Sequence, residues 1–206
     1  MEIPPKSAPR IFLIDAYALI YRAFFAFIQR PLVNSRGENT SAPFGFTRFL
    51  LDIREKFEPD YLAVVFDAGS SFRDEMYPDY KATREKMPDD LSASIGRIRD
   101  IVHGFRDTCV ELDGYEADDV IGTLATAAGM PVDVVTGDRD LFQLVDDEAQ
   151  VRILYTARGV GRHERVTNTV VQDKYGIDGR QYADFAALRG DPSDGLPGVA
   201  GVGEKT

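Results

Sequence analysis

Three short apolar runs in this sequence each lead into an acidic residue, and this pattern constrains the fold more than any other feature. The runs are residues 10–15, 61–67 and 131–138, and they lead into Asp15, Asp67 and Asp138. Short apolar runs of this length predict buried strands. Because the segments between them have helical spacing, we expect βαβ units and a mostly parallel sheet. The three acids should then meet at the carboxyl edge, where open α/β sheets bind ligands.

The remaining pattern predicts one α/β domain of 206 residues, with helices flanking the central sheet. A further short strand is expected at residues 108–112, and a hairpin is expected from residues 150–155 and 161–166. Helices are expected at residues 16–27, 42–57, 91–105, 117–129, 167–175 and 181–188, and another should begin at 141–145. Residues 69–90 are polar and predict a loop.

A second acidic feature is the stretch from Gly114 to Gly122, which contains Glu116, Asp118 and Asp119 directly before a helical apolar pattern. Acidic side chains in a first helical turn complement the helix dipole, which would explain one carboxylate. Three together repel one another unless a counter-charge is present. A divalent cation with oxygen ligands would supply it. The stretch alone leaves both interpretations open.

More carboxylates follow in positions that can reach the same edge. Asp140 lies two residues after Asp138, and Asp191 and Asp194 lie in the C-terminal segment. An oxygen-only ligand set suits Mg²⁺ or Mn²⁺ better than zinc. Two such ions promote the attack of water on phosphodiesters. The nine candidate ligands are Asp15, Asp67, Glu116, Asp118, Asp119, Asp138, Asp140, Asp191 and Asp194.

Composition narrows the class of protein. The single cysteine, Cys109, excludes an intramolecular disulfide and Cys-based zinc sites. The net charge of −10 argues against a nucleic-acid partner, unless bound cations reverse the field of the acidic cluster. No run of 18 apolar residues predicts a membrane span, and the N-terminus lacks a signal-peptide pattern. We therefore expect a cytoplasmic protein without a membrane partner, and nothing in the sequence predicts an oligomer, so a monomer is expected.

Two further segments carry features of nucleic-acid binding. Within residues 69–90, Arg73, Lys81 and Arg84 alternate with aromatic residues such as Tyr80. Such a segment is either a solvated loop or one that grips a phosphate backbone and stacks on bases. Near the C-terminus, closely spaced glycines allow a tight hairpin that a phosphate could approach, although a flexible tail is the alternative. This hairpin contains Gly198, Gly201 and Gly203, followed by Lys205.

Taken in order, these motifs resemble the 5′ nuclease domain of bacterial DNA polymerase I, in the flap endonuclease superfamily. The matching segments are residues 14–17 with 21–24, 65–68, 72–73 with 80–84, 115–119, 136–140 and 190–206. The resemblance covers nearly the whole chain. It implies a metal-dependent 5′→3′ exonuclease and structure-specific flap endonuclease, which acts on DNA and RNA primers in replication and repair.

The resemblance also implies roles for individual residues. Asp15, Asp67, Glu116, Asp118 and Asp119 would hold the catalytic metal, and Asp138, Asp140, Asp191 and Asp194 a second one. Lys81 and Arg84 would lie on a helical arch within residues 69–90 and polarise the scissile phosphate. Arg73 and Arg22 would also contact phosphate, and Tyr80 would contact DNA.

A helix–three-turn–helix, often with a K⁺ ion, is implied at residues 191–206, after a catalytic core of about residues 1–190. Its glycines and Lys205 would grip a duplex through its backbone, so the enzyme would select DNA structure rather than sequence. Expected partners are DNA with a 5′ flap, a nick or a 5′ single-stranded end, RNA–DNA primer junctions, and a fused or separate DNA polymerase.

The sequence departs from the family in two places. Gly195 stands where the family usually has Asn, which should loosen the turn without removing a ligand. The chain also stops at Thr206, inside the helix–three-turn–helix, so we expect a fragment whose metal ligands are complete but whose duplex grip is not.

The sequence is also to be compared with the patterns of three other functions. A PIN-like ribonuclease has similar acidic strand ends, but the basic segment and the glycine hairpin argue against it. A non-catalytic module that binds DNA structures would result if truncation abolished turnover. A haloacid-dehalogenase-type phosphatase should have Asp-x-Asp after its first strand, whereas Asp15 is followed by Ala16 and Tyr17.

Overall fold

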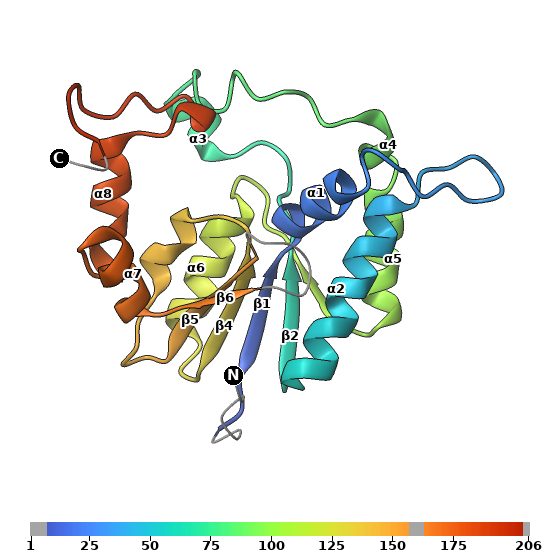
Figure 1. Ribbon diagram of the computed structural model, residues 1–206, viewed down its shortest axis with the longest axis horizontal. Helices are drawn as coiled ribbons and strands as arrows, with labels where there is room; N and C mark the ends of the chain where they lie inside the picture. Colours follow the sequence, from blue (N-terminus) through green and yellow to red (C-terminus); the bar gives the residue numbers. More distant parts are fainter. Residues whose placement is uncertain (1–7, 157–162, 204–206) are drawn as a thin grey trace.

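The computed structural model describes residues 8–156 and 163–203, which form a six-stranded sheet with helices on both faces (Figure 1). The strand order is β3-β2-β1-β4-β5-β6; only β6 is antiparallel to its neighbour. The strands are β1 (Ile11–Asp15), β2 (Tyr61–Val65), β3 (Thr108–Val110), β4 (Val132–Thr136), β5 (Val151–Tyr155) and β6 (Glu164–Val166). The predicted mostly parallel α/β sheet is confirmed, and β1 lies at its centre between β2 and β4.

Alternating side chains along β1 divide the core into two layers. Phe12 and Ile14 pack beneath one set of helices, and Leu13 packs beneath the other. The first set is α1 (Ala16–Ala26), α2 (Ser41–Phe57) and α5 (Ile95–Gly104). The second set is α6 (Ala117–Ala127), η1 (Asp140–Leu144), α7 (Asn168–Tyr175) and α8 (Tyr182–Arg189). Since both faces are covered, the strands are apolar almost throughout, as expected for a parallel sheet.

The elements match the expectations with a few differences. Instead of one helix at residues 91–105, the chain forms α4 (Asp89–Ser92) and then α5, and η1 is a 3₁₀ rather than an α-helix. The hairpin is present as β5 and β6, and its connection, residues 157–162, lies outside the described residues. Short 3₁₀ turns, η2 (Gly179–Gln181) and η3 (Pro192–Asp194), flank α8.

Residues 69–90, which we call the arch segment, cross above the carboxyl edge of the sheet (Figure 1). Most of the segment is irregular: only α3 (Phe72–Met76) and the start of α4 are helical. Ser71 begins α3 by accepting a hydrogen bond from the backbone N–H of Arg73. Pro78, Pro88 and the positive φ of Lys81 interrupt any longer helix. The described helices include none long and apolar enough to cross a membrane.

The contact between α1 and α2 requires glycine at position 45. A Cβ atom there would lie 2.7 Å from the Cβ of Ala23, closer than two carbon atoms can pack. Because α1 follows directly from β1, this contact fixes how α1 leaves the carboxyl edge.

We predict that Gly45→Ala will destabilise the protein by about 1–3 kcal/mol, since the added methyl group must push α1 away from α2. Gly96→Ala in α5 is the matched control, because a Cβ there would meet nothing within 4 Å. Gly96→Ala should be neutral, or stabilising by up to about 1 kcal/mol. Urea unfolding of both variants tests this, and equal stabilities would contradict the packing argument.

Candidate active site

A cavity of about 930 Å³ opens at the carboxyl edge of the sheet, below the arch segment. Eight of the nine predicted metal ligands line it, and the ninth, Asp191, lines an adjoining cavity. The eight are Asp15, Asp67, Glu116, Asp118, Asp119, Asp138, Asp140 and Asp194. Tyr80, Lys81, Arg84 and Arg73 line the same cavity. The structure therefore brings together acids that are up to 179 positions apart in the chain.

Asp15 belongs both to the fold and to the cavity. It is the last residue of β1 and the N-cap of α1, where its carboxylate accepts a hydrogen bond from the N–H of Ala18 (3.1 Å). Its second oxygen accepts one from the hydroxyl of Thr136 at the end of β4 (2.7 Å). Burial nevertheless raises the pKa of Asp15 to about 6, and the negative charges of Asp67 and Asp138 add to the shift.

Asp118, in the first turn of α6, lies half-buried among the like charges. Burial, followed by repulsion from Asp15, Asp138 and Asp67, raises its pKa to about 8. Asp67, which follows β2, accepts a hydrogen bond from the N–H of Ala117 at the start of α6 (2.8 Å). That bond holds β2 and α6 together at the cavity wall.

A second group of acids lies beyond β4. Burial and the charges of Asp138, Asp191 and Asp194 raise the pKa of Asp140 to about 6. Asp138 orders the turn into η1, because its carboxylate accepts a hydrogen bond from the N–H of Asp140 (2.9 Å). Because its charge contributes to the raised pKa of Asp15, Asp118 and Asp140, Asp138 lies near both this group and the acids at the ends of β1 and β2.

The donor chemistry of this cavity fits divalent cations. Asp15, Asp67, Asp118, Asp138 and Asp140 make no ion pair with a basic side chain in the described part of the chain. Their mutual repulsion is the charge imbalance that a hard cation with oxygen ligands removes. Within residues 8–156 and 163–203, no three acids lie close enough to enclose an ion, so they line the cavity without closing around one point.

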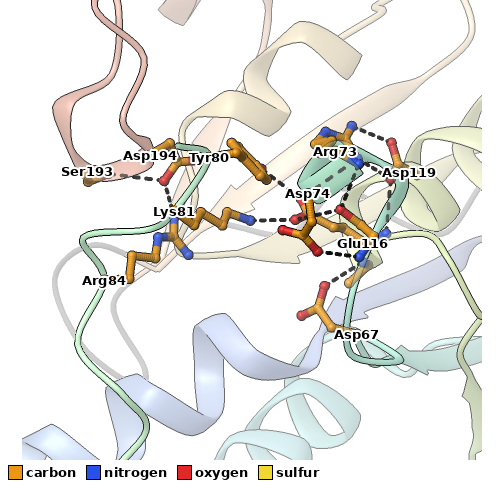
Figure 2. Close-up of polar contacts among 12 residues, drawn as sticks. Asp67, Arg73, Asp74, Tyr80, Lys81, Arg84, Glu116, Asp119, Ser193 and Asp194 are labelled. Atoms are coloured by element: carbon orange, nitrogen blue, oxygen red, sulfur yellow. Dashed lines mark hydrogen bonds and ion pairs between the residues drawn. The ribbon is translucent and has the colours of Figure 1, made fainter. Parts of the chain in front are cut away.

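Glu116 is neutralised by the arch segment (Figure 2). The ammonium of Lys81 donates to one carboxylate oxygen (2.8 Å), and the hydroxyl of Tyr80 donates to the other (2.9 Å). Although burial acts against the charge of Lys81, these contacts raise its pKa. Lys81 adopts a positive φ of 54°, an uncommon conformation for a residue with a side chain.

Asp119 is held by Arg73 through two hydrogen bonds of 2.6 and 2.7 Å (Figure 2). It also accepts a bond from the N–H of Glu116 (3.0 Å), as expected of an acid in a first helical turn. The bonds from Arg73 lower the pKa of Asp119. Asp119 is thus the member of the cluster that fits the helix-terminus interpretation, and the guanidinium of Arg73 is turned to it.

The C-terminal segment contacts the arch segment from the other side. Arg84 forms an ion pair with Asp194, and the N–H of Lys81 donates to the carbonyl of Asp194 (2.9 Å; Figure 2). Gly195 has a φ of 76°, and a Cβ there would lie 2.5 Å from the carbonyl oxygen of Asp79. The expectation that glycine loosens this turn is therefore wrong: its lack of a side chain permits a close contact.

The predicted glycine hairpin is described only in part. Gly198 packs against Gly190, since a Cβ on Gly198 would lie 2.5 Å from the nitrogen of Gly190, so this glycine serves the turn itself. Cβ atoms at Gly201 and Gly203 would meet nothing within 4 Å. Lys205 lies outside the described residues.

Sequence reasoning missed two residues. Thr136 bonds to Asp15, and its hydroxyl also accepts from the N–H of Asp138 (2.9 Å), so it links two strand ends. Arg139 lies between two of the acids and donates to the hydroxyl of Tyr155 (3.1 Å). The sequence did contain a signal for each: Thr136 is a hydroxyl residue at the end of an apolar run, and Arg139 is a basic residue between two acidic ones.

The family model of the 5′–3′ exonuclease N-terminal, resolvase-like domain matches residues 10–176. The chain belongs to the 5′–3′ exonuclease family. It is 42% identical over 207 residues to a 5′–3′ exonuclease of Streptomyces coelicolor, a match that covers 94% of this chain and 68% of that one.

Two other similar proteins extend this comparison. DNA polymerase I of Mycobacterium bovis is 43% identical over 205 residues, which cover 98% of this chain but only 22% of the polymerase. This exonuclease-family chain therefore spans about a fifth of that relative's length. The bacteriophage T5 flap endonuclease, solved as a pseudo-enzyme–product complex with DNA and metal ions, shares the fold with a TM-score of 0.71 at 18% identity, covering 95% of this chain and 72% of that one.

We predict that the metal-free protein loses stability as the pH rises from about 5 to about 8. Asp15 and Asp140 have a pKa of about 6, and Asp118 one of about 8, against 3.8 as the ordinary value. The folded state then binds more protons than the unfolded state over this window, so the free energy of unfolding falls as pH rises. With about 1.4 kcal/mol per pKa unit, the melting temperature in chelator should fall by several degrees.

Two variants and one addition check the cause of this loss. Asp118→Asn should raise the melting temperature at pH 8 and flatten the pH profile, whereas Asp173→Asn, at an exposed position on α7, should change neither. Mg²⁺ or Mn²⁺ should restore stability at pH 8 in the original protein more than in Asp118→Asn. A flat profile in chelator would contradict the repulsion argument.

We predict that Gly195→Ala loosens the arch segment, because the new Cβ would collide with the carbonyl of Asp79. Gly201→Ala is the control: it has a similar φ of 81°, but its Cβ would meet nothing within 4 Å. The strain of a positive φ, about 1 kcal/mol, is common to both variants, so any further loss of stability in Gly195→Ala reports the collision. Limited proteolysis should cut the arch segment faster in Gly195→Ala; equal cutting rates would disprove the contact.

Proposed function

We propose that this chain is a metal-dependent 5′→3′ exonuclease and structure-specific 5′ flap endonuclease, which hydrolyses phosphodiester bonds in DNA and RNA primers during replication and repair. The observation that carries the proposal is the cavity itself, where uncompensated carboxylates on the sheet edge face basic side chains of the arch segment. Hydrolysis of a phosphodiester requires cationic groups that stabilise the charge of the phosphate, and it requires a site that activates water.

Mg²⁺ or Mn²⁺ is the proposed cofactor, since the donors are all carboxylate oxygens. Ions bound there would lower the pKa of an attacking water and stabilise the leaving 3′ oxygen. Asp15, Asp67, Asp118 and Asp138 form one proposed ligand group, and Asp138, Asp140, Asp191 and Asp194 the other. Glu116 and Asp119 are also proposed ligands. To bind an ion they must be released by Lys81 and Arg73, which would then contact the substrate instead.

This exchange of partners defines the role of the basic residues. Lys81, Arg73 and Arg84 each bond to a carboxylate that lines the cavity. If ions bind these carboxylates, the basic side chains can turn to the oxygens of a substrate phosphate. Lys81 and Arg84 would then stabilise the charge that develops during hydrolysis.

The substrate is proposed to be DNA with a 5′ flap, a nick or a 5′ single-stranded end, and RNA–DNA primer junctions. The names of the relatives, a 5′–3′ exonuclease and a flap endonuclease solved with DNA and metal ions, support this. We also propose action as a monomer, in the cytoplasm at the nucleoid, together with or fused to a DNA polymerase. Gly198, Gly201, Gly203 and Lys205 would contact the duplex, with K⁺ as a further ligand of the hairpin. A non-catalytic DNA-binding fragment is the alternative that cleavage assays would reveal.

We predict that a 5′-labelled flap duplex is cut near its junction in Mg²⁺ or Mn²⁺ and not in chelator. Asp118→Ala and Asp67→Ala should lose more than the roughly 10–100-fold that changes in the surroundings of a metal typically cause. Lys81→Ala should lose about 10²–10³-fold through the chemical step. Asp173→Asn is the control and should cut normally. Binding of the flap without cleavage in any divalent metal would support the non-catalytic alternative instead.

A further inference from the structure

A second cavity, of about 500 Å³, adjoins the acidic one and shares Ala18, Asp138 and Asp140 with it. Its remaining wall contains three arginines, Arg22, Arg139 and Arg189, and one further carboxylate, Asp191. The arch segment does not contribute to this wall, so these arginines form a basic group separate from Lys81 and Arg84. Asp138 and Asp140 thus line both cavities, one with the basic residues of the arch segment and the other with these arginines.

Arg22 projects from α1 toward the end of β4. Its Nη2 atom lies 3.2 Å from where a Cβ of Gly137 would be, so the absence of a side chain at position 137 makes room for the guanidinium. The Nε atom of Arg22 is buried and has no hydrogen-bond partner in the described part of the chain. A buried donor without a partner is costly, so an acceptor that reached this atom would stabilise the site.

Arg139 is oriented by a phenol rather than by an acid. Its Nε donates to the hydroxyl of Tyr155, whose ring packs edge-on against Phe142 at 5.2 Å between centroids. Neither Arg139 nor Arg22 forms an ion pair with any described carboxylate, in contrast to Arg73 and Arg84. Two guanidinium groups therefore line one cavity without forming an ion pair, although the carboxylates of Asp138, Asp140 and Asp191 line it as well.

Two planar guanidinium groups in one cavity suit a tetrahedral oxyanion, because each can donate parallel hydrogen bonds to its oxygens. We propose that this cavity binds a backbone phosphate of the nucleic acid, other than the scissile one, through Arg22 and Arg139. The inference rests on the proposed function, and it adds Arg139 as a binding residue and Tyr155 as the residue that positions it. The position beside Asp138 and Asp140 favours a backbone phosphate near the cut, because this cavity shares both residues with the acidic one.

The test measures binding without cleavage, using the full chain and a fluorescent 5′ flap duplex in Ca²⁺. Arg139→Gln and Arg22→Gln should each weaken binding on the order of tenfold and lower the slope of log affinity against log salt by about one. Arg180→Gln is the matched control, since Arg180 is exposed and pairs with Asp146. Tyr155→Phe should weaken binding less than Arg139→Gln, because it keeps the charge and loses only the orientation. Unchanged melting temperatures show that the variants are folded.

A scan with single methylphosphonate substitutions along the cleaved strand locates the phosphate. In the original protein, one non-scissile position should lose affinity, and Arg139→Gln should no longer respond at that position. If Arg139→Gln and Arg22→Gln bind like Arg180→Gln, or if no position responds, the proposal is overturned. If inorganic phosphate stabilises the original protein but not Arg139→Gln while flap binding is unchanged, the cavity takes free phosphate and the backbone assignment is overturned.

The outcome is independent of the cleavage assay. Position-specific binding through Arg139 without cleavage in Mg²⁺ or Mn²⁺ would reject the proposed nuclease function and leave this binding site intact. Cleavage together with binding that does not depend on Arg139 would support the nuclease function and overturn this binding site.

Discussion

Repulsion among carboxylates gathered at one edge of the sheet is the constraint on which the rest of this structure depends. Three parallel strands deliver Asp15, Asp67 and Asp138 to one edge, and α6 adds Asp118 between them. Burying these carboxylates and bringing their charges together both oppose folding: burial first, and then repulsion, raises the pKa of Asp15 and of Asp118. The sheet tolerates it because two apolar layers, beneath helices on both faces, hold the strands in place.

Charge is distributed unevenly around the cavity. The outer acids have cationic partners: Glu116 bonds to Lys81, Asp119 to Arg73 and Asp194 to Arg84. Asp15 and Asp67 instead accept hydrogen bonds from backbone N–H groups, and Asp15 accepts one from the hydroxyl of Thr136. The cavity therefore has carboxylates without cationic partners at its centre and carboxylates with cationic partners around them. This arrangement occurs in a chain that belongs to the 5′–3′ exonuclease family.

The sequence predicted the sheet and the edge at which the acids meet, because each acid follows the end of an apolar run and parallel strands end at the same edge. It could not predict which acids would be neutralised. Arg73 and Asp119 are 46 residues apart, and their bidentate pair depends on α3, which a polar segment with two prolines did not reveal. The role of Gly195 was misjudged for a related reason: the carbonyl of Asp79 that excludes a side chain there comes from a distant segment. Local patterns report strands and helices, whereas contacts between loops depend on the assembled fold.

The double position of Asp15 has a consequence for how variants of this protein can be interpreted. The same carboxylate ends β1, caps α1 and faces the cavity. Loss of a helix cap costs about 1 kcal/mol, whereas relief of charge repulsion acts in the opposite direction. An inactive protein altered at position 15 could therefore be misfolded, misaligned or merely unable to bind an ion, and its melting temperature would not separate these causes. Asp118 makes no capping bond in the described structure, so a change there removes a charge from the cavity without removing a helix cap, whereas at position 15 one side chain carries both.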